Sequence, residues 1–206
     1  MMVKNEIYGI FPTPVYVSEI DRKLTDNELN FVFENKKYFC KNDSNIVTEN
    51  KYILNETIFS NLKKEINLKI SDYFSKIICT SNNIEPYITQ SWITYTEKNQ
   101  YHAKHHHPNS IVSGVLYIDC DEKLDKIIFF KDRYETIKLE IEKQNLWNSD
   151  RCIFYVKPGD IILFPSHLKH MVETTQSDKT RISLAFNVFI RGQIGKNEFS
   201  SELILV

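Results

Sequence analysis

A two-residue period typical of a β-strand runs through Tyr87-Ile88-Thr89-Gln90-Ser91-Trp92-Ile93-Thr94-Tyr95. β-Branched and aromatic side chains dominate this stretch, and such residues favour a pleated, half-buried strand. Further strands are predicted downstream over residues 111–118, 126–131, 150–156, 161–164 and 181–190. The part of the chain that follows residue 86 therefore reads as a β domain built from short strands joined by turns.

The N-terminal part carries helical signals instead. Thr25-Asp26-Asn27-Glu28 has the pattern of a capping box and predicts a helix that continues to about Phe39. Asn55 is expected to cap a longer helix. Its apolar residues recur at nearly helical spacing, namely Ile58, Leu62, Ile66, Ile70, Phe74 and Ile78. Residues 41–54 are polar and are predicted to be a loop, and residues 7–17 an extended arm bounded by prolines.

Helices before the strands, rather than between them, indicate the fold class. We expect a mainly β fold with α: a double-stranded β-helix (jelly roll, cupin-like) with N-terminal covering helices. The helical cover is expected over about residues 20–80 and the barrel over about residues 86–195. A chain of 206 residues suits a single domain, residues 1–206, and is short for two.

Composition narrows the classes of function. The chain is 42% hydrophobic and 13% aromatic, which supports a buried core and argues against a disordered protein. A formal net charge of −1 gives no electrostatic reason to expect nucleic acid or a membrane surface as partner. The N-terminus lacks the pattern of a secretory signal, and no stretch approaches the roughly 20 apolar residues that span a bilayer. We expect a cytoplasmic protein, for which a homodimer stays open.

The cysteines fit that location. Cys40, Cys79, Cys120 and Cys152 lie far apart and form no C-x-x-C pair. We expect reduced thiols, most of them buried, because cytoplasmic disulfides are rare and a free cysteine behaves as a small apolar residue.

All histidines of the chain fall into two short clusters. The first contains His102 and His105-His106-His107, and the second His167 and His170. Neutral imidazole is the commonest transition-metal ligand. Because residues i and i+2 of a strand face the same side, His105 and His107 are expected to point together into the barrel, and His170 to complete a metal site. A solvent-facing loop that binds metal adventitiously is the alternative, and the roles of His102, His106 and His167 stay open.

An arginine follows the second cluster within a strand-like segment. Arg181 and Ser183 share one strand face. A guanidinium binds a carboxylate through two parallel hydrogen bonds, and a neighbouring hydroxyl adds another. Arg181 is therefore expected to anchor the far end of a dicarboxylate cosubstrate that chelates the metal. The alternative is an exposed strand charge.

Several sequence blocks in a fixed order resemble one protein family. These blocks are Ile10-Phe11-Pro12-Thr13-Pro14-Val15, Ser91-Trp92-Ile93, His105-His106-His107-Pro108-Asn109-Ser110, Ser113-Gly114-Val115-Leu116-Tyr117, Pro158-Gly159-Asp160, Phe164-Pro165-Ser166, His170-Met171-Val172-Glu173, Arg181-Ile182-Ser183 and Phe186-Asn187. They resemble the 2-oxoglutarate and Fe(II)-dependent oxygenases with an H-x-H-P-N-S motif, of bacterial and phage type. The resemblance covers residues 10–16 and about 90–195.

The resemblance implies both the cofactors and the site. Fe(II) would be bound by His105, His107 and His170, and the distal carboxylate of 2-oxoglutarate by Arg181 with Ser183 as helper. Tyr117 would be a further cosubstrate contact, with core packing as the competing role. The implied reaction converts 2-oxoglutarate and O2 to succinate and CO2 while hydroxylating a small molecule or a protein side chain. Many better-known relatives carry H-x-D, so the all-histidine ligand set is a departure.

Two other functions remain open at this stage. One is a three-histidine metal dioxygenase that does not use 2-oxoglutarate, and the other is a non-enzymatic cupin-like binding protein. Substitution of Arg181 separates the first from a 2-oxoglutarate enzyme, and substitution of His105 tests the second.

Overall fold

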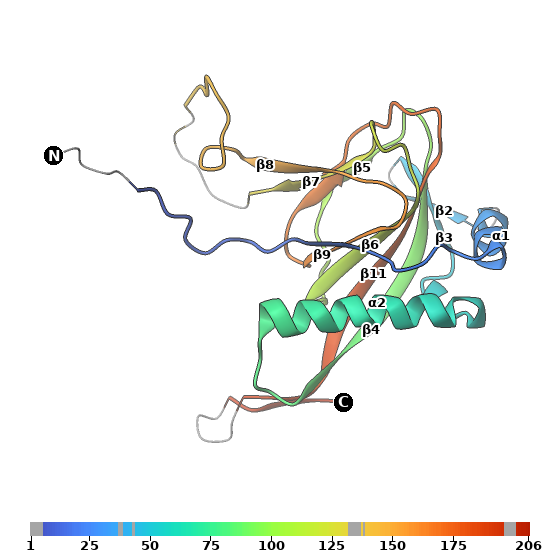
Figure 1. Ribbon diagram of the computed structural model, residues 1–206, viewed down its shortest axis with the longest axis horizontal. Helices are drawn as coiled ribbons and strands as arrows, with labels where there is room; N and C mark the ends of the chain where they lie inside the picture. The colour runs from blue at the N-terminus through green and yellow to red at the C-terminus, as the bar shows by residue number, and fades with distance from the viewer. Residues whose placement is uncertain (1–5, 37–38, 43, 132–136, 138, 196–200) are drawn as a thin grey trace.

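Two antiparallel sheets face each other in the computed structural model, which describes residues 6–36, 39–42, 44–131, 137, 139–195 and 201–206 (Figure 1). The larger sheet has the order β1 (Tyr16–Glu19), β9 (Asp160–Pro165), β6 (Val112–Asp119), β11 (Arg181–Ile194), β4 (Ile84–Thr96), β3 (Asn45–Thr48) and β2 (Phe39–Asn42), and β12 (Leu203–Leu205) pairs with β11. The smaller sheet has the order β5 (His102–His105), β10 (His170–Val172), β7 (Lys126–Phe130) and β8 (Arg151–Tyr155). This is the two-sheet, mainly β architecture predicted from the sequence.

The helices lie before β4 in the chain. They are α1 (Asp26–Asn35) and α2 (Ser60–Tyr73), with the short 3₁₀ segments η1 (Ile53–Asn55) and η2 (Thr57–Phe59) before α2 and the π-helical turn η3 (Phe74–Ile78) after it. Figure 1 shows α2 crossing β4 and β11 of the larger sheet. Leu62, Ile66 and Ile70 of α2 are fully buried against that sheet, so the predicted apolar spacing does mark a buried helix face.

The first helix starts as predicted and ends earlier. The Thr25 side chain accepts from the Glu28 backbone N–H, and the Glu28 carboxylate accepts from the Thr25 backbone, which completes the capping box. The helix ends at Asn35 and not near Phe39, which begins β2. From Phe39 onward the chain pairs as β2 with β3, and this pairing overrides the local helical pattern.

Two other N-terminal predictions were wrong. Asn55 does not cap α2, which begins at Ser60; its side-chain oxygen accepts from Lys63 Nζ at 2.8 Å. Residues 41–54 are not one loop, because they contain the end of β2, all of β3 and part of η1. The polar composition of this segment did not indicate strands. β3 forms because it pairs with β4 on one side and with the edge strand β2 on the other.

Two hydrophobic cores lie on opposite faces of the larger sheet. The outer core lies between the sheet and α2 and includes Leu116, Leu184 and Phe186. The inner core lies between the two sheets and is formed by Tyr117, Cys120, Ile127, Phe129, Val156, Ile162, Phe164 and Leu168. Full burial of each large apolar side chain contributes about 1.5–3 kcal/mol. The inner face also carries polar side chains, and it is there that the candidate site lies.

Gly114 on β6 allows the outer core to close. A Cβ atom at this position would overlap the Phe186 ring and would lie 2.7 Å from Cδ2 of Leu163. Gly114→Ala should therefore lower the free energy of unfolding by about 1–3 kcal/mol, the usual effect of overpacking, as measured by urea denaturation. Gly9→Ala is the matched control, because its Cβ would meet nothing nearer than 3.4 Å. Equal stability of the two variants would contradict this account of the packing.

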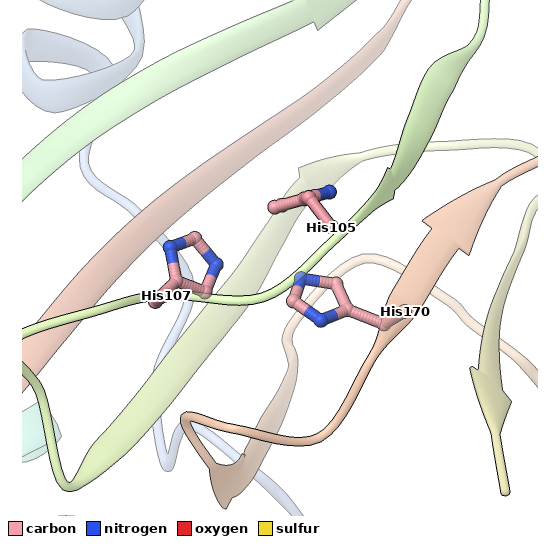
Figure 2. Close-up of side chains that lie close together, drawn as sticks. All are labelled: His105, His107 and His170. Atoms are coloured by element: carbon pink, nitrogen blue, oxygen red, sulfur yellow. The ribbon is translucent and has the colours of Figure 1, made fainter. Parts of the chain in front are cut away.

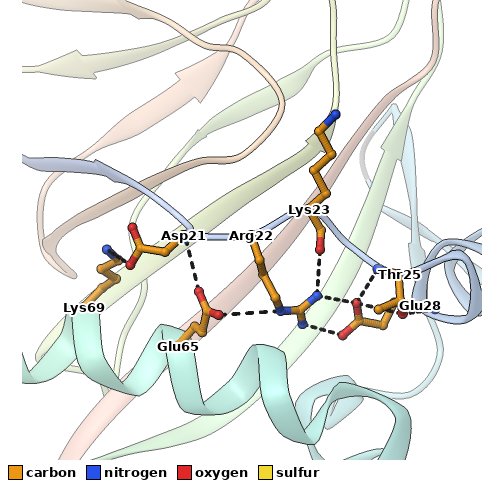
Figure 3. A network of polar contacts seen from close by, with 7 residues as sticks. All are labelled: Asp21, Arg22, Lys23, Thr25, Glu28, Glu65 and Lys69. Carbon is orange, nitrogen blue, oxygen red and sulfur yellow. Dashed lines mark hydrogen bonds and ion pairs between the residues drawn. The ribbon is translucent and has the colours of Figure 1, made fainter.

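A network of charged groups joins the segment before α1 to α2 (Figure 3). Arg22 donates from Nη1 and Nη2 to the two carboxylate oxygens of Glu28 at 2.7 and 2.6 Å, and its Nε lies 3.6 Å from Glu65 of α2. The backbone of Asp21 donates to Glu65 at 3.1 Å, and Lys69 pairs with the Asp21 carboxylate at 3.0 Å. Asp21 and Arg22 are therefore held against α2, and Arg22 also ties this segment to α1 through Glu28.

Glu28 makes this network sensitive to acid. Its side chain is buried, which acts to raise its pKa, but hydrogen bonds from Arg22 and from the Thr25 backbone outweigh burial and hold the pKa below the ordinary value of 4.5. A lowered folded pKa means that the stabilisation is complete above the unfolded value and is lost as the pH falls through the folded one. Calorimetry between pH 7 and pH 3 (about the carboxylate range) should show a larger fall of Tm for the wild type than for Glu28→Gln. Parallel curves would exclude this role of Glu28.

The cysteine prediction was only partly correct. Cys120 is buried, whereas Cys79 and Cys152 are exposed, and all three are free thiols. The Cys40 side chain lies outside the described part. Within the described ranges, no helix has the length and apolar character needed to cross a membrane.

Candidate metal centre

Three imidazoles from separate segments converge between the two sheets (Figure 2). One ring nitrogen from each of His105, His107 and His170 lies within 4.8 Å of the other two. The ring centroids are 4.3 Å apart for His105 and His170, and 5.1 Å apart for His107 and His170. The pairing of His105 on β5 with His170 on β10 creates this proximity between residues that are distant in the sequence.

His107 reaches the centre from a loop and not from the strand that carries His105. β5 ends at His105, so the prediction that both residues lie in one strand was wrong. Pro108 has no backbone N–H and restricts the residue before it, and Asn109 has a positive φ of 54°, so the chain turns here. The His107 backbone N–H donates to the Ser166 carbonyl at 2.9 Å, which fixes the loop.

A chain of buried hydroxyl groups holds this loop to the barrel. The Ser166 hydroxyl is fully buried; it donates to Ser110 Oγ at 2.8 Å and lies 2.9 Å from Ser113 Oγ. Ser113 donates in turn to Oδ1 of Asn187 on β11 at 3.0 Å. Satisfied buried polar groups of this kind specify one arrangement. The loop is thereby tied to β6 and β11.

Hydrogen bonds to the backbone set the tautomers of two of the rings. His105 Nδ1 lies 2.8 Å from the Ala103 carbonyl, and His170 Nδ1 lies 3.0 Å from the Leu168 carbonyl. Because a carbonyl oxygen only accepts, Nδ1 carries the proton in both rings and Nε2 carries the lone pair. This is the arrangement in which protein backbones orient metal-binding histidines.

Their surroundings keep the His107 and His170 rings uncharged. Burial, followed by the neighbouring histidines, lowers the pKa of His170 to about 3 and that of His107 to about 4. The Phe164 ring lies 4.7 Å from the His170 ring, which contributes an apolar wall. At neutral pH His107 and His170 are therefore in the form that binds a metal. Three imidazole nitrogen donors suit a first-row divalent ion such as Fe(II).

Arg181 lies at the start of β11 with its guanidinium buried. It is only 2% exposed, so the alternative of an exposed strand charge was wrong. Its Nε and Nη1 are buried and have no hydrogen-bond partner among the described residues. Buried charged donors without a partner are rare and unfavourable, and a carboxylate ligand would satisfy both. The structure thus fits a dicarboxylate cosubstrate at this position.

Ser183 and Tyr117 lie next to Arg181 on the inner face. β11 pairs regularly with β4 from Arg181 to Asn187, so Ser183 shares the face of Arg181 as predicted. Tyr117 is paired with Ser183 and is buried in the inner core. Burial raises its pKa above the ordinary value, and the nearby Arg181 charge opposes this only in part. Tyr117 does pack in the core, and its contact with a cosubstrate remains a prediction.

The other three histidines lie outside the group of three, His102 beside it and His106 and His167 at the surface. The His102 ring stacks on the His105 ring at a centroid distance of 4.2 Å, outside the group of three. His106 and His167 are exposed and line a cavity of about 540 Å³ that also includes Pro14 and Tyr73.

Sequence patterns did not single out Trp92 as part of the site. Its ring lies 5.9 Å from that of His107. Trp92 pairs with Ala185, in step with Ser183 and Arg181 on the same face of β11. The alternation of β4 does not tell which of its faces points inward, so the sequence alone could not place Trp92 beside His107. The register between β4 and β11 is what places it there.

Comparison with known proteins gives one family match. Residues 90–187 match the family model described as "Putative 2OG-Fe(II) oxygenase". This segment contains the three converging histidines and also Tyr117, Arg181 and Ser183. No protein of curated function is similar enough in sequence to match the chain.

Several solved structures have a fold similar to that of this chain. HygX from Streptomyces hygroscopicus, with nickel, 2-oxoglutarate and hygromycin B bound, has a TM-score of 0.56 at 13% identity over 85% of this chain and 82% of that chain. A Pseudomonas putida prolyl-4-hydroxylase has a TM-score of 0.57 at 11% identity over 85% of this chain and 92% of that chain. The collagen prolyl hydroxylase of Paramecium Bursaria Chlorella virus-1 has 0.51 at 14% identity, over 84% and 94%. The predicted double-stranded β-helix is thereby confirmed.

Proposed function

We propose that this chain is an Fe(II)- and 2-oxoglutarate-dependent dioxygenase of the H-x-H-P-N-S type. The enzyme class and its two cofactors are those of the family matched by residues 90–187. The observation that carries the proposal is the buried Arg181, whose unpaired N–H groups lie in the same barrel as three converging histidines. In the reaction, 2-oxoglutarate is decarboxylated to succinate and CO2, and one oxygen atom of O2 enters succinate. The other oxygen atom is inserted into a C–H bond of the substrate as a hydroxyl.

Each residue of the site has a defined role in this proposal. His105, His107 and His170 hold Fe(II), and Arg181 binds the distal carboxylate of 2-oxoglutarate with help from Ser183. Tyr117 forms the adjoining wall. When bound, iron and 2-oxoglutarate supply the oxidising chemistry, while the protein orients them and excludes water. Phe129 and Phe164 provide that exclusion beside His170.

The remaining features follow from the sequence. We propose one catalytic domain over residues 1–206 and a cytoplasmic location. The substrate is a small organic molecule or a protein side chain rather than a nucleic acid, given the net charge of −1. A homodimer is a separate hypothesis, which light scattering of the purified protein tests.

The wild-type protein provides the direct test. Anaerobic addition of Fe(II) and then 2-oxoglutarate should give a weak visible charge-transfer band, and admission of air should release succinate. His105→Ala should show neither signal. Absence of both signals from the folded wild type would reject the proposal. Uptake of O2 with a chelating organic substrate but without 2-oxoglutarate would favour the three-histidine dioxygenase instead.

A further inference from the structure

Three neighbouring strands of the larger sheet, β4, β11 and β6, each have one partly exposed residue in a segment that is otherwise buried (Figure 1). The three residues are Trp92 within Ser91–Thr96 of β4, Ala185 within Arg181–Val188 of β11, and Val115 within Val112–Ile118 of β6. Central strands are normally covered by close-packed side chains on both faces. Solvent therefore reaches the middle of the sheet at these positions.

The three residues form one row across the sheet. Ala185 pairs with Trp92 on one side and with Val115 on the other, and directly paired residues of antiparallel strands point to the same face. That face is the inner one, since Val115 packs against the inner core and the Trp92 ring lies 5.9 Å from the His107 ring. The solvent-accessible row therefore lies between the two sheets, beside the metal centre.

The rows on either side of this apolar row are polar. Towards Arg181, the next row on the inner face consists of three buried residues with hydroxyl groups, namely Thr94, Ser183 and Tyr117. The row on the other side consists of Gln90, Asn187 and Ser113. A dicarboxylate bound by Arg181 has its polar neighbours in the hydroxyl row. The apolar row, which carries neither charge nor hydroxyl, suits a different molecule.

We propose that Trp92, Ala185 and Val115 form the floor of the primary-substrate site, and that the substrate places an uncharged aliphatic or aromatic group on this floor. The inference rests on the proposed function, in which a C–H bond of that group is hydroxylated. Sites for small molecules have mostly apolar and aromatic walls with a few polar groups, and the neighbouring rows supply the polar ones. The small side chain of Ala185 leaves room in the middle of the row, and the Trp92 ring adds a large apolar contact. A charged group would lose its solvation here without compensation.

Relaxation of probe protons by bound Mn(II) tests this assignment, because a paramagnetic ion accelerates the relaxation of protons held near it. The protein is loaded with Mn(II) and 2-oxoglutarate and mixed with p-cresol or cyclohexanol as apolar probes, or with glycerol as a polar probe. The loaded wild type should accelerate relaxation of both apolar probes and not of glycerol. Trp92→Ala should raise the Kd for p-cresol by about tenfold, as for loss of an aromatic pair. Ala185→Leu fills the space over the row and should abolish the effect for both apolar probes.

Trp147→Ala is the matched control, because Trp147 is the second tryptophan of the chain and lies between β7 and β8, outside the row. It should leave the relaxation of every probe unchanged. The inference is overturned if the apolar probes relax no faster than glycerol, or if neither Trp92→Ala nor Ala185→Leu weakens their binding.

Two further outcomes decide between this inference and its neighbours. Loss of 2-oxoglutarate binding in a folded Ala185→Leu protein would assign the row to the cosubstrate and overturn the inference. If Ala185→Leu does not fold, Trp92→Ala decides alone, since it removes a partly exposed ring. If the Mn(II)-loaded wild type does not bind 2-oxoglutarate at all, the proposed function fails, whereas normal 2-oxoglutarate binding without binding of the apolar probes overturns this inference alone.

Discussion

Arg181→Leu should raise the Kd of the metal-loaded protein for 2-oxoglutarate by about 100-fold, as expected when one partner of a buried charge pair is lost. The guanidinium is almost completely buried, and within the described part of the chain its Nε and Nη1 have no hydrogen-bond partner to compensate for lost solvation. A bound carboxylate would be left without its counter-charge in the variant. Calorimetric titration and the KM for 2-oxoglutarate in succinate release should both show the loss, with Fe(II) affinity unchanged.

Two further substitutions make this result specific. Arg191→Leu is the matched control, because Arg191 lies on the same strand, is exposed, and pairs with Glu85 at 3.0 Å. It should leave 2-oxoglutarate affinity unchanged. Arg181→Lys should recover only part of the affinity, since an ammonium keeps the charge but not the two parallel donors. An Arg181→Leu enzyme with unchanged cosubstrate dependence would contradict the assigned role and favour the dioxygenase that works without 2-oxoglutarate.

Sequence patterns predicted the strands of five or more residues well, including β7, β8 and β9, and most of the strands of three or four residues poorly. β4, β6 and β11 are long enough for their β-branched and aromatic residues to mark them as strands, although β6 and the first ten residues of β11 are buried at nearly every position and not at alternate ones. β5 and β10 have four and three residues and begin or end at metal-site histidines, so no hydrophobic period exists to read. β3 was missed because its pairing with β4, and not its own composition, makes it a strand.

Some residues of the candidate site could be predicted from the sequence and others could not. His105, His107, His170 and Arg181 could be selected from residue type and spacing, because imidazole clusters and a strand arginine are chemically distinctive. The positions of Trp92 and His102 depend on register between strands, and a one-residue shift turns every side chain to the other face. The pairing of β5 with β10 contains such a shift, and nothing in the spacing of the histidines announces it. The residue types of the metal ligands and of the carboxylate anchor were therefore predictable from the sequence, whereas the positions that depend on strand register were not.

His170→Ala should have the largest effect on metal binding, lowering Fe(II) affinity by about 100-fold or more, since even indirect partners of metal ligands contribute about 10–100-fold. His170 is 6% exposed and its ring is oriented by the Leu168 carbonyl, so its removal takes away a buried and preoriented ligand. The iron retained per chain after dialysis should fall to background, and succinate release should fall with it. His167→Ala, which changes an exposed histidine nearby, should retain iron.

His107→Asp distinguishes loss of a ligand from loss of a histidine. The variant would have two histidines and one carboxylate, the ligand set typical of Fe(II) oxygenases, so it should retain iron where His107→Ala does not. The shorter aspartate has to reach the centre from the loop that Ser166 and Pro108 hold in place. Retention of iron by both His107→Ala and His170→Ala would mean that these rings do not share an ion, and the proposed oxygenase would lose its metal site.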